Sequence, residues 1–79
     1  MKTINSEKES FQIRSYGKSE LAQLYLPDIT PCAARRTFNS WIDLSPGLMD
    51  RLKAYGFTPS SHYYTPMQVR LIVDALGEP

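Results

Sequence analysis

The chain has 79 residues and a formal net charge of +1 at pH 7. A chain of this length forms one small domain with little room for an enclosed active site. The charge lacks the strong basic excess of many nucleic-acid-binding proteins. No apolar run approaches the roughly 20 residues that span a bilayer, and the polar first ten residues do not resemble a signal peptide. The single Cys excludes an internal disulfide, so we expect a cytoplasmic protein.

The residue composition of the chain changes near residue 11. Residues 1–10 are polar and mixed in charge, which predicts a flexible arm ahead of a single helical domain at residues 11–79. Residues 11–14 alternate apolar and polar side chains, which favours a short strand, and residues 15–17 then favour a turn. Helical spacing of the apolar residues predicts the first helix at residues 18–26.

A hydroxyl residue followed by proline opens three later stretches with helical spacing, at Thr30-Pro31, Ser45-Pro46 and Thr65-Pro66. A Ser or Thr at the N-cap accepts a hydrogen bond from an unpaired backbone N–H. Proline at the next position loses nothing, because its missing N–H would have had no helical partner. Gln68 adds a capping box to the third start. The predicted helices span residues 31–42, 46–55 and 66–76.

The helix at residues 31–42 gathers its apolar side chains on one face, and we expect all of them in the core: Ala34, Phe38, Trp41 and Ile42. We predict that Gly56 and Gly77 end the two later helices. Of Tyr63 and Tyr64, we expect one to pack against the start of the last helix and the other to be exposed. The further core residues that we predict are Leu21, Leu24, Tyr25, Leu48, Met49, Leu52, Tyr55, Val69, Ile72, Val73 and Leu76.

These elements predict a mainly α fold, a compact four-helix domain with a helix-turn-helix-like core, with or without a small β-ribbon or wing. Ala22 provides the small residue that lets the second helix of such a motif cross the first closely. No acidic residue lies between Ile29 and Ile42, so the polar face of that helix is locally positive and suits the major groove of DNA. The candidate DNA-binding residues are Lys18, Arg35, Arg36, Asn39, Ser40, Arg51 and Lys53.

Two features leave another interpretation open. The connection at residues 26–30 is longer than the tight turn of the strict motif and has no glycine. Arg35 and Arg36 are equally well explained as the solvated face of an amphipathic helix. The alternative function is a protein-interaction module of the same fold that binds a partner or itself through Met67, Leu71 and Tyr63.

Residues 16–79 resemble winged helix-turn-helix domains of the MerR and excisionase type, in which the last helix is introduced by a phrase like Tyr64-Thr65-Pro66-x-Gln68-Val69. This resemblance implies a DNA-binding regulator or a phage-type accessory protein. The chain is also similar to a family of short uncharacterised proteins from gut anaerobic bacteria, a domain of unknown function, which implies no activity. The segments that carry this similarity are residues 15–22, Trp41-Ile42, Pro46-Gly47-Leu48 and residues 65–79.

The chain offers little for catalysis. Cys32 and His62 are each the only residue of their type, so the usual Cys/His metal sets are absent, and no third residue can be named that would orient such a pair. A glycine-rich phosphate loop, an HExxH motif and a paired-carboxylate signature are absent as well. We therefore expect no enzyme, no cofactor and no metal.

Overall fold

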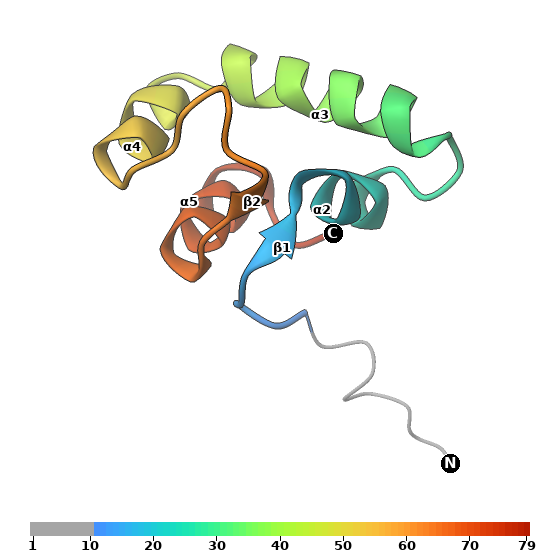
Figure 1. The fold of residues 1–79 in the computed structure, drawn as a ribbon, viewed down its shortest axis with the longest axis horizontal. Helices are drawn as coiled ribbons and strands as arrows, with labels where there is room; N and C mark the ends of the chain where they lie inside the picture. Colours follow the sequence, from blue (N-terminus) through green and yellow to red (C-terminus); the bar gives the residue numbers. More distant parts are fainter. Residues whose placement is uncertain (1–10) are drawn as a thin grey trace.

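A computed structural model of the chain describes residues 11–79, in which four helices surround a two-stranded antiparallel sheet (Figure 1). The mainly α fold with a small β-ribbon is therefore confirmed. The arm predicted at residues 1–10 lies outside the described residues. In chain order the elements are β1 (Tyr16–Gly17), α2 (Lys18–Tyr25), α3 (Pro31–Leu44), α4 (Leu48–Ala54), β2 (Tyr63–Tyr64) and α5 (Pro66–Leu76).

Helix α3 lies along one side of the molecule, and α2, the sheet and α5 lie beneath it (Figure 1). The most extensive contact between helices joins α2 to α3. Ala22 on α2 and Ala34 on α3 are both completely buried, and small side chains allow two helix axes to approach closely. The polar face of α3 is left exposed, with Arg35, Arg36, Asn39 and Ser40 at the surface.

Two of the three predicted helix starts are confirmed. The Thr30 hydroxyl accepts a hydrogen bond from the Ala33 N–H at 3.3 Å. At the start of α5, the Thr65 hydroxyl accepts from the Gln68 N–H at 3.3 Å, and the Gln68 side chain accepts from the Thr65 N–H at 3.0 Å. The Gln68 amide also donates to the Tyr55 carbonyl at 2.8 Å, so this capping box ties α5 to the end of α4.

The third predicted start, at Ser45-Pro46, is wrong. Ser45 ends α3 instead, because its hydroxyl donates to the Trp41 carbonyl at 2.9 Å and satisfies a group at the helix C-terminus. Helix α3 therefore runs on to Leu44, and α4 begins only after Gly47, whose φ of 74° is readily adopted by glycine. A serine hydroxyl can accept from a backbone N–H at the start of a helix or donate to a carbonyl at its end. Here the end of α3 and the start of α4 lie within a few residues of each other.

The strand predicted at residues 11–14 is also misplaced, since the predicted turn at residues 15–17 contains β1. Tyr16 pairs with Tyr64, and Gly17 pairs with Tyr63. The Tyr16 ring is buried and stacks on the ring of Phe11, with the centroids 5.3 Å apart. A strand of two residues carries too little alternation to show in the sequence, and its position is decided by this burial.

The aromatic centre of the core is Tyr64, which is completely buried while Tyr63 is 65% exposed, as predicted for this pair. The Tyr64 ring stacks on the ring of Phe57, with the centroids 5.5 Å apart, and makes an edge contact with Phe38, with the centroids 6.2 Å apart. Phe57 reaches this position because Gly56, with a φ of 91°, ends α4 as predicted.

Three residues predicted in the core lie at the surface: Trp41 (36% exposed), Leu24 (45%) and Tyr55 (52%). The buried stripe of α3 consists of Ala34, Phe38 and Ile42. Trp41 flanks this stripe and makes edge contacts, 6.4 Å between centroids, with Phe38 and Tyr25. Periodicity locates the middle of a buried face, but the width of that face depends on how the neighbouring helix covers it.

Substitutions within this stripe and beside it should differ in their cost in folding stability. Phe38→Ala should lower the free energy of unfolding by about 3–5 kcal/mol, because it leaves a cavity between α3 and Tyr64. Trp41→Ala should lower it by only about 1–2 kcal/mol, since the side chain already contacts water. Urea unfolding followed by circular dichroism measures both, and equal losses would contradict the burial difference.

The capping box predicts a second stability effect. Thr65→Ala should lower the free energy of unfolding by about 1 kcal/mol, because the Gln68 N–H loses its side-chain acceptor. Thr65→Ser is the control, since it keeps the hydroxyl and should retain most of the wild-type stability. An unfolding midpoint that is the same for Thr65→Ala and wild type would show that the hydroxyl does not stabilise α5.

Tyr64 predicts an effect at alkaline pH. Its hydroxyl is buried without a hydrogen-bond partner among the described residues, so Tyr64→Phe should raise the free energy of unfolding by about 1 kcal/mol near pH 7. Burial raises the pKa of Tyr64 to about 12, although the positive charge of Arg35 acts to lower it. Since an unfolded tyrosine has a pKa near 10, the stability that wild type gains from keeping Tyr64 protonated is complete below about pH 10 and is lost as the pH rises through 12. Tyr64→Phe should therefore lose less stability than wild type between these two values.

Tyr25→Phe is the control for the measurement near pH 7. The Tyr25 hydroxyl donates to the Gly77 carbonyl, so its removal should destabilise the fold by about 1 kcal/mol near pH 7. A destabilising Tyr64→Phe would show that the Tyr64 hydroxyl has a partner in solution.

Candidate nucleic-acid interface

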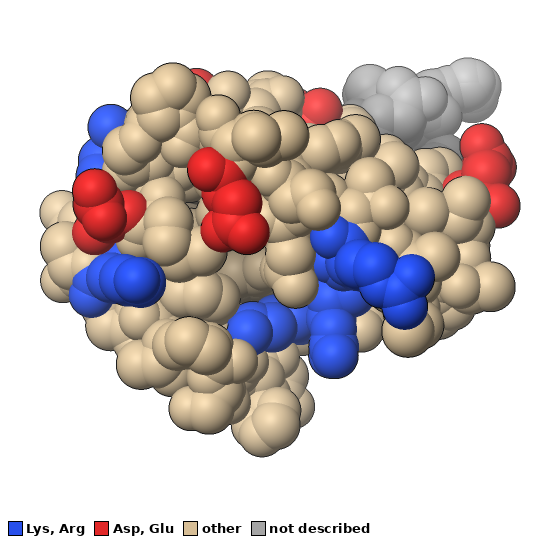
Figure 2. Space-filling model, turned by 90° about the horizontal axis from the view of Figure 1, so that it is seen from above, with Lys and Arg blue, Asp and Glu red and all other residues tan. Residues whose placement is uncertain are grey.

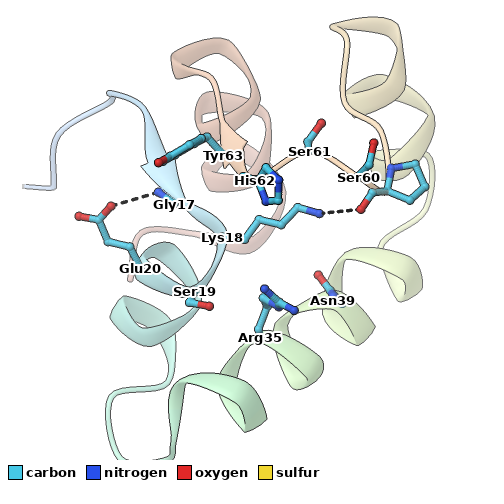
Figure 3. Close-up of a pocket in the computed structure, with 11 residues that line it drawn as sticks. Gly17, Lys18, Ser19, Glu20, Arg35, Asn39, Ser60, Ser61, His62 and Tyr63 are labelled. Atoms are coloured by element: carbon cyan, nitrogen blue, oxygen red, sulfur yellow. Dashed lines mark hydrogen bonds between the residues drawn. The ribbon is translucent and has the colours of Figure 1, made fainter.

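An open groove runs between α3 and the segment that leads into β2 (Figure 3). Its larger part has a volume of about 840 Å³, and a smaller hollow of about 310 Å³ shares Lys18, Asn39 and Pro59 with it. We call the two parts together the Lys18 groove. The larger part is lined by Gly17, Lys18, Ser19, Glu20, Arg35, Asn39, Pro59, Ser60, Ser61, His62 and Tyr63, and the smaller part adds Asp43, Met49, Lys53 and Phe57.

Lys18, the first residue of α2, reaches across the groove. Its ammonium group donates to the Pro59 carbonyl at 3.3 Å and lies 4.7 Å from the centroid of the Phe57 ring. Partial burial, and next the positive charge of Arg35, lower the pKa of Lys18 from its ordinary value. Lys18 thus connects α2 to the far wall of the groove while keeping a cation beside α3.

Arg35 and Asn39 form the α3 wall. They lie one helical turn apart, so they share a face of α3, and Figure 3 shows both directed at the groove from below the Lys18 side chain. Both residues are exposed. The α3 wall therefore offers one permanent cation and one amide to anything that enters the groove.

The other predicted DNA-binding residues of α3 lie outside the groove. Arg36 and Ser40 are exposed, and neither lines the groove. The Arg36 guanidinium is 4.0 Å from the Cys32 sulfur, and the Ser40 hydroxyl donates to the Arg36 carbonyl at 3.3 Å. They occupy the outermost face of the helix, next to the wall formed by Arg35.

The two predicted residues of α4 separate from each other. Lys53 lines the smaller hollow, whereas Arg51 is exposed and lines neither part. Figure 2 views the molecule from the α3 side: basic side chains adjoin one another near the middle of this face, and other basic side chains lie apart at the α4 end. The structure thus brings Lys18, Arg35, Asn39 and Lys53 to one groove, with Arg36 and Ser40 beside it and Arg51 away from it.

Several lining residues were not predicted, namely Ser19, Glu20, Ser60, Ser61 and His62. The last three reach the groove because the Lys18 N–H donates to the His62 carbonyl at 3.2 Å, which extends the β1–β2 pairing. Glu20 is turned toward other groups, since its carboxylate accepts from the Gly17 N–H at 3.1 Å and from Arg14 at 3.2 Å. These two hydrogen bonds lower the pKa of Glu20. No local sequence pattern indicates that residues 60–62 reach the groove.

The residues predicted for a protein interface are divided between two places. Tyr63 lines the Lys18 groove. Met67, on α5, is 45% exposed, and Leu71 is half-buried and packs against the core. These residues therefore belong to the wall of the groove and to α5.

The features of residues 11–79 also bear on other kinds of site. No three His, Cys, Asp or Glu side chains of this segment gather in a way that would hold a metal ion. Cys32 is exposed near the start of α3 and does not line the groove beside His62. In the same segment, no helix has the length and apolar character required to cross a membrane.

Comparison with known proteins identifies a family. No curated protein and no solved structure matches the chain. A family model described as "Domain of unknown function (DUF4248)" matches residues 12–79, which is almost all of the part that the structure describes. The chain therefore belongs to the DUF4248 family, a domain of unknown function.

Proposed function

We propose that this domain is a cytoplasmic, non-enzymatic module that binds double-stranded DNA through the exposed face of α3, as a regulator or a phage-type accessory protein. The observation that carries the proposal is the uncovered polar side of α3. Arg35, Arg36, Asn39 and Ser40 are all exposed there, and Lys18 adds a cation at the edge. Arginine can fork onto guanine or phosphate, and asparagine can pair with adenine.

The arrangement of α2 and α3 supports a helix-turn-helix interpretation. The two helices pack against each other through a buried Ala22, and α3 presents its outer face to solvent. In a helix-turn-helix domain the second helix lies in the major groove while the first crosses the backbone. Helix α3 has 14 residues, so it is about 21 Å long at 1.5 Å per residue. The major groove, about 12 Å wide, admits a helix of this kind.

The flanking elements support a winged arrangement. The segment from Pro59 to His62 forms the wall of the Lys18 groove opposite α3, and in the proposed complex it would serve as the wing. The winged interpretation gives Lys18, together with Lys53 or Arg51, the role of contacting phosphates on either side of the helix.

A second candidate is a protein-interaction module of the same fold. Tyr63 is 65% exposed and Met67 is 45% exposed, and half-buried Leu71 lies one helical turn after Met67. Exposed apolar side chains of this size favour contact with a protein surface if they form one patch. This candidate predicts self-association or partner binding without any dependence on Arg35.

Titration with a mixed-sequence duplex at several salt concentrations tests the first candidate. The double variant Arg35→Ala/Arg36→Ala should stay folded, since both side chains lie on the exposed side of α3. It should lose most duplex binding, and the slope of log affinity against log salt should fall by up to about 1.8, since each phosphate contact contributes about 0.9. Circular dichroism verifies the fold.

Arg70→Ala is the control, because it removes a cation from the exposed surface of α5, away from the Lys18 groove. Its duplex affinity should stay close to that of wild type. Wild-type protein that binds no duplex at low salt would overturn the DNA-binding proposal. Sedimentation of wild type and of Met67→Asp would then test self-association.

A further inference from the structure

We infer that the larger part of the Lys18 groove is a binding site for a single phosphate group and that, in a DNA complex, it holds one backbone phosphate beside α3. The identity of the phosphate as part of DNA rests on the proposed function. The site itself rests on the groove and on the residues that line it.

The cations of the groove lack acidic partners. Lys18 and Arg35 both line it. Within residues 11–79 the only ion pair joins Arg14 to Glu20, at 3.2 Å, so no described carboxylate lies within 4.0 Å of either cation. Glu20 lines the groove as well, but its carboxylate is already bound by Arg14 and by the Gly17 N–H. The larger part of the groove therefore carries two positive charges that no described residue neutralises.

The proximity of these two cations favours an anion. Arg35 lies beneath the Lys18 side chain in the groove (Figure 3), and the pKa of Lys18 is lowered first by its partial burial and next by the charge of Arg35. An anion between them would relieve this repulsion and would receive charge-assisted hydrogen bonds from both. Asp43 lines only the smaller hollow, together with Lys53, so the anion is expected in the larger part.

Neutral polar groups complete the lining from three directions. Ser19 comes from α2, Asn39 from α3 and His62 from the segment before β2 (Figure 3). Asn39 and His62 are exposed and Ser19 is half-buried, so all three side chains are accessible to a bound group. Donors that converge from several sides suit the oxygens of a phosphate, which point to the corners of a tetrahedron. The oxygens of a carboxylate lie in one plane, and the fork of Arg35 suits either group.

The far wall of the groove is already held in place. The Ser61 hydroxyl accepts from the Thr58 N–H at 3.1 Å, and the Ser61 N–H donates to the Thr58 carbonyl at 3.0 Å. The Lys18 ammonium group holds the Pro59 carbonyl at 3.3 Å. A wall that is ordered before binding reduces the entropy that the complex loses. The ammonium group has three N–H donors, so it can keep this bond and also donate to a phosphate.

The phosphate site gives different roles to different residues of α3. Arg35 and Asn39 line the groove, so in a complex they hold the DNA backbone. Arg36 and Ser40 lie on the outermost face of the helix, so in a complex they are the residues that contact the base edges. The site thus predicts that the two neighbouring arginines differ in function: Arg35 sets affinity on any sequence, and Arg36 contributes to sequence preference.

The test is an NMR titration of the full chain with inorganic phosphate, with chloride adjusted to constant ionic strength. The amide signals of Lys18, Ser19 and residues 60–62 should shift and saturate. Lys18→Gln and Arg35→Gln should each weaken phosphate binding about tenfold, which corresponds to the loss of one charge-assisted hydrogen bond. Arg36→Gln and Arg70→Gln are charge-matched controls that should keep the wild-type affinity for phosphate.

Shifts that fail to saturate, that map to other residues, or that persist unchanged in both Lys18→Gln and Arg35→Gln would overturn the site. If one of these two variants fails to fold, the other still tests the phosphate site.

A duplex titration separates this inference from the proposed function. Lys18→Gln should lower the salt slope by about 0.9 on every sequence. Wild-type protein that binds phosphate in the groove but no duplex would overturn the DNA source, and the ligand would then be a free phosphate ester. Duplex binding with an unchanged slope in Lys18→Gln, and without phosphate binding, would overturn the site and leave the DNA-binding proposal standing.

Discussion

The pairing of β1 with β2 is the constraint on which the rest of this structure depends. It joins Tyr16 and Gly17 to Tyr64 and Tyr63, and the bond from the Lys18 N–H to the His62 carbonyl extends it by one step. This contact brings the start of α2 next to the start of α5, although the two helices are far apart in the sequence. The ribbon is short, so its stability comes from the two buried tyrosine rings rather than from its hydrogen bonds.

The same pairing creates the Lys18 groove. One wall belongs to α3, and the other belongs to residues 59–63, whose path is fixed where the chain enters β2. Lys18 lies between the walls because it follows β1 directly. A sequence change that weakened the ribbon would therefore open the groove and separate Lys18 from Arg35. Fold stability and the candidate site are coupled here through the burial of Tyr16 and Tyr64.

The features that the sequence predicts well are those decided by nearby residues. The Thr30 and Thr65 caps and the glycine at the end of α4 depend on groups within one helical turn, and the structure contains all three. Ser45 was misassigned because a hydroxyl can satisfy an N–H at one helix start or a carbonyl at the preceding helix end. Trp41 was misassigned because the edge of a buried face depends on the neighbouring helix. The groove depends on contacts such as the one between Lys18 and Pro59, which spans 41 positions, so residue types indicated Lys18, Arg35 and Asn39, but no pattern indicated residues 60–62.

The net charge of +1 is only a weak argument against DNA binding, because binding depends on where the charges lie. At physiological ionic strength, charges more than about 8 Å apart at the surface are largely screened from each other. A phosphate near α3 therefore responds to the cations around it rather than to the charge of the whole domain. Figure 2 shows those cations adjoining one another, with acidic side chains standing apart from them on the same face. Few phosphate contacts also mean a shallow salt dependence and weak non-specific binding. A domain of this kind would owe its affinity for a given site mainly to the fit of α3 in the groove of the DNA, so its contacts with base edges, rather than its total charge, would decide where it binds.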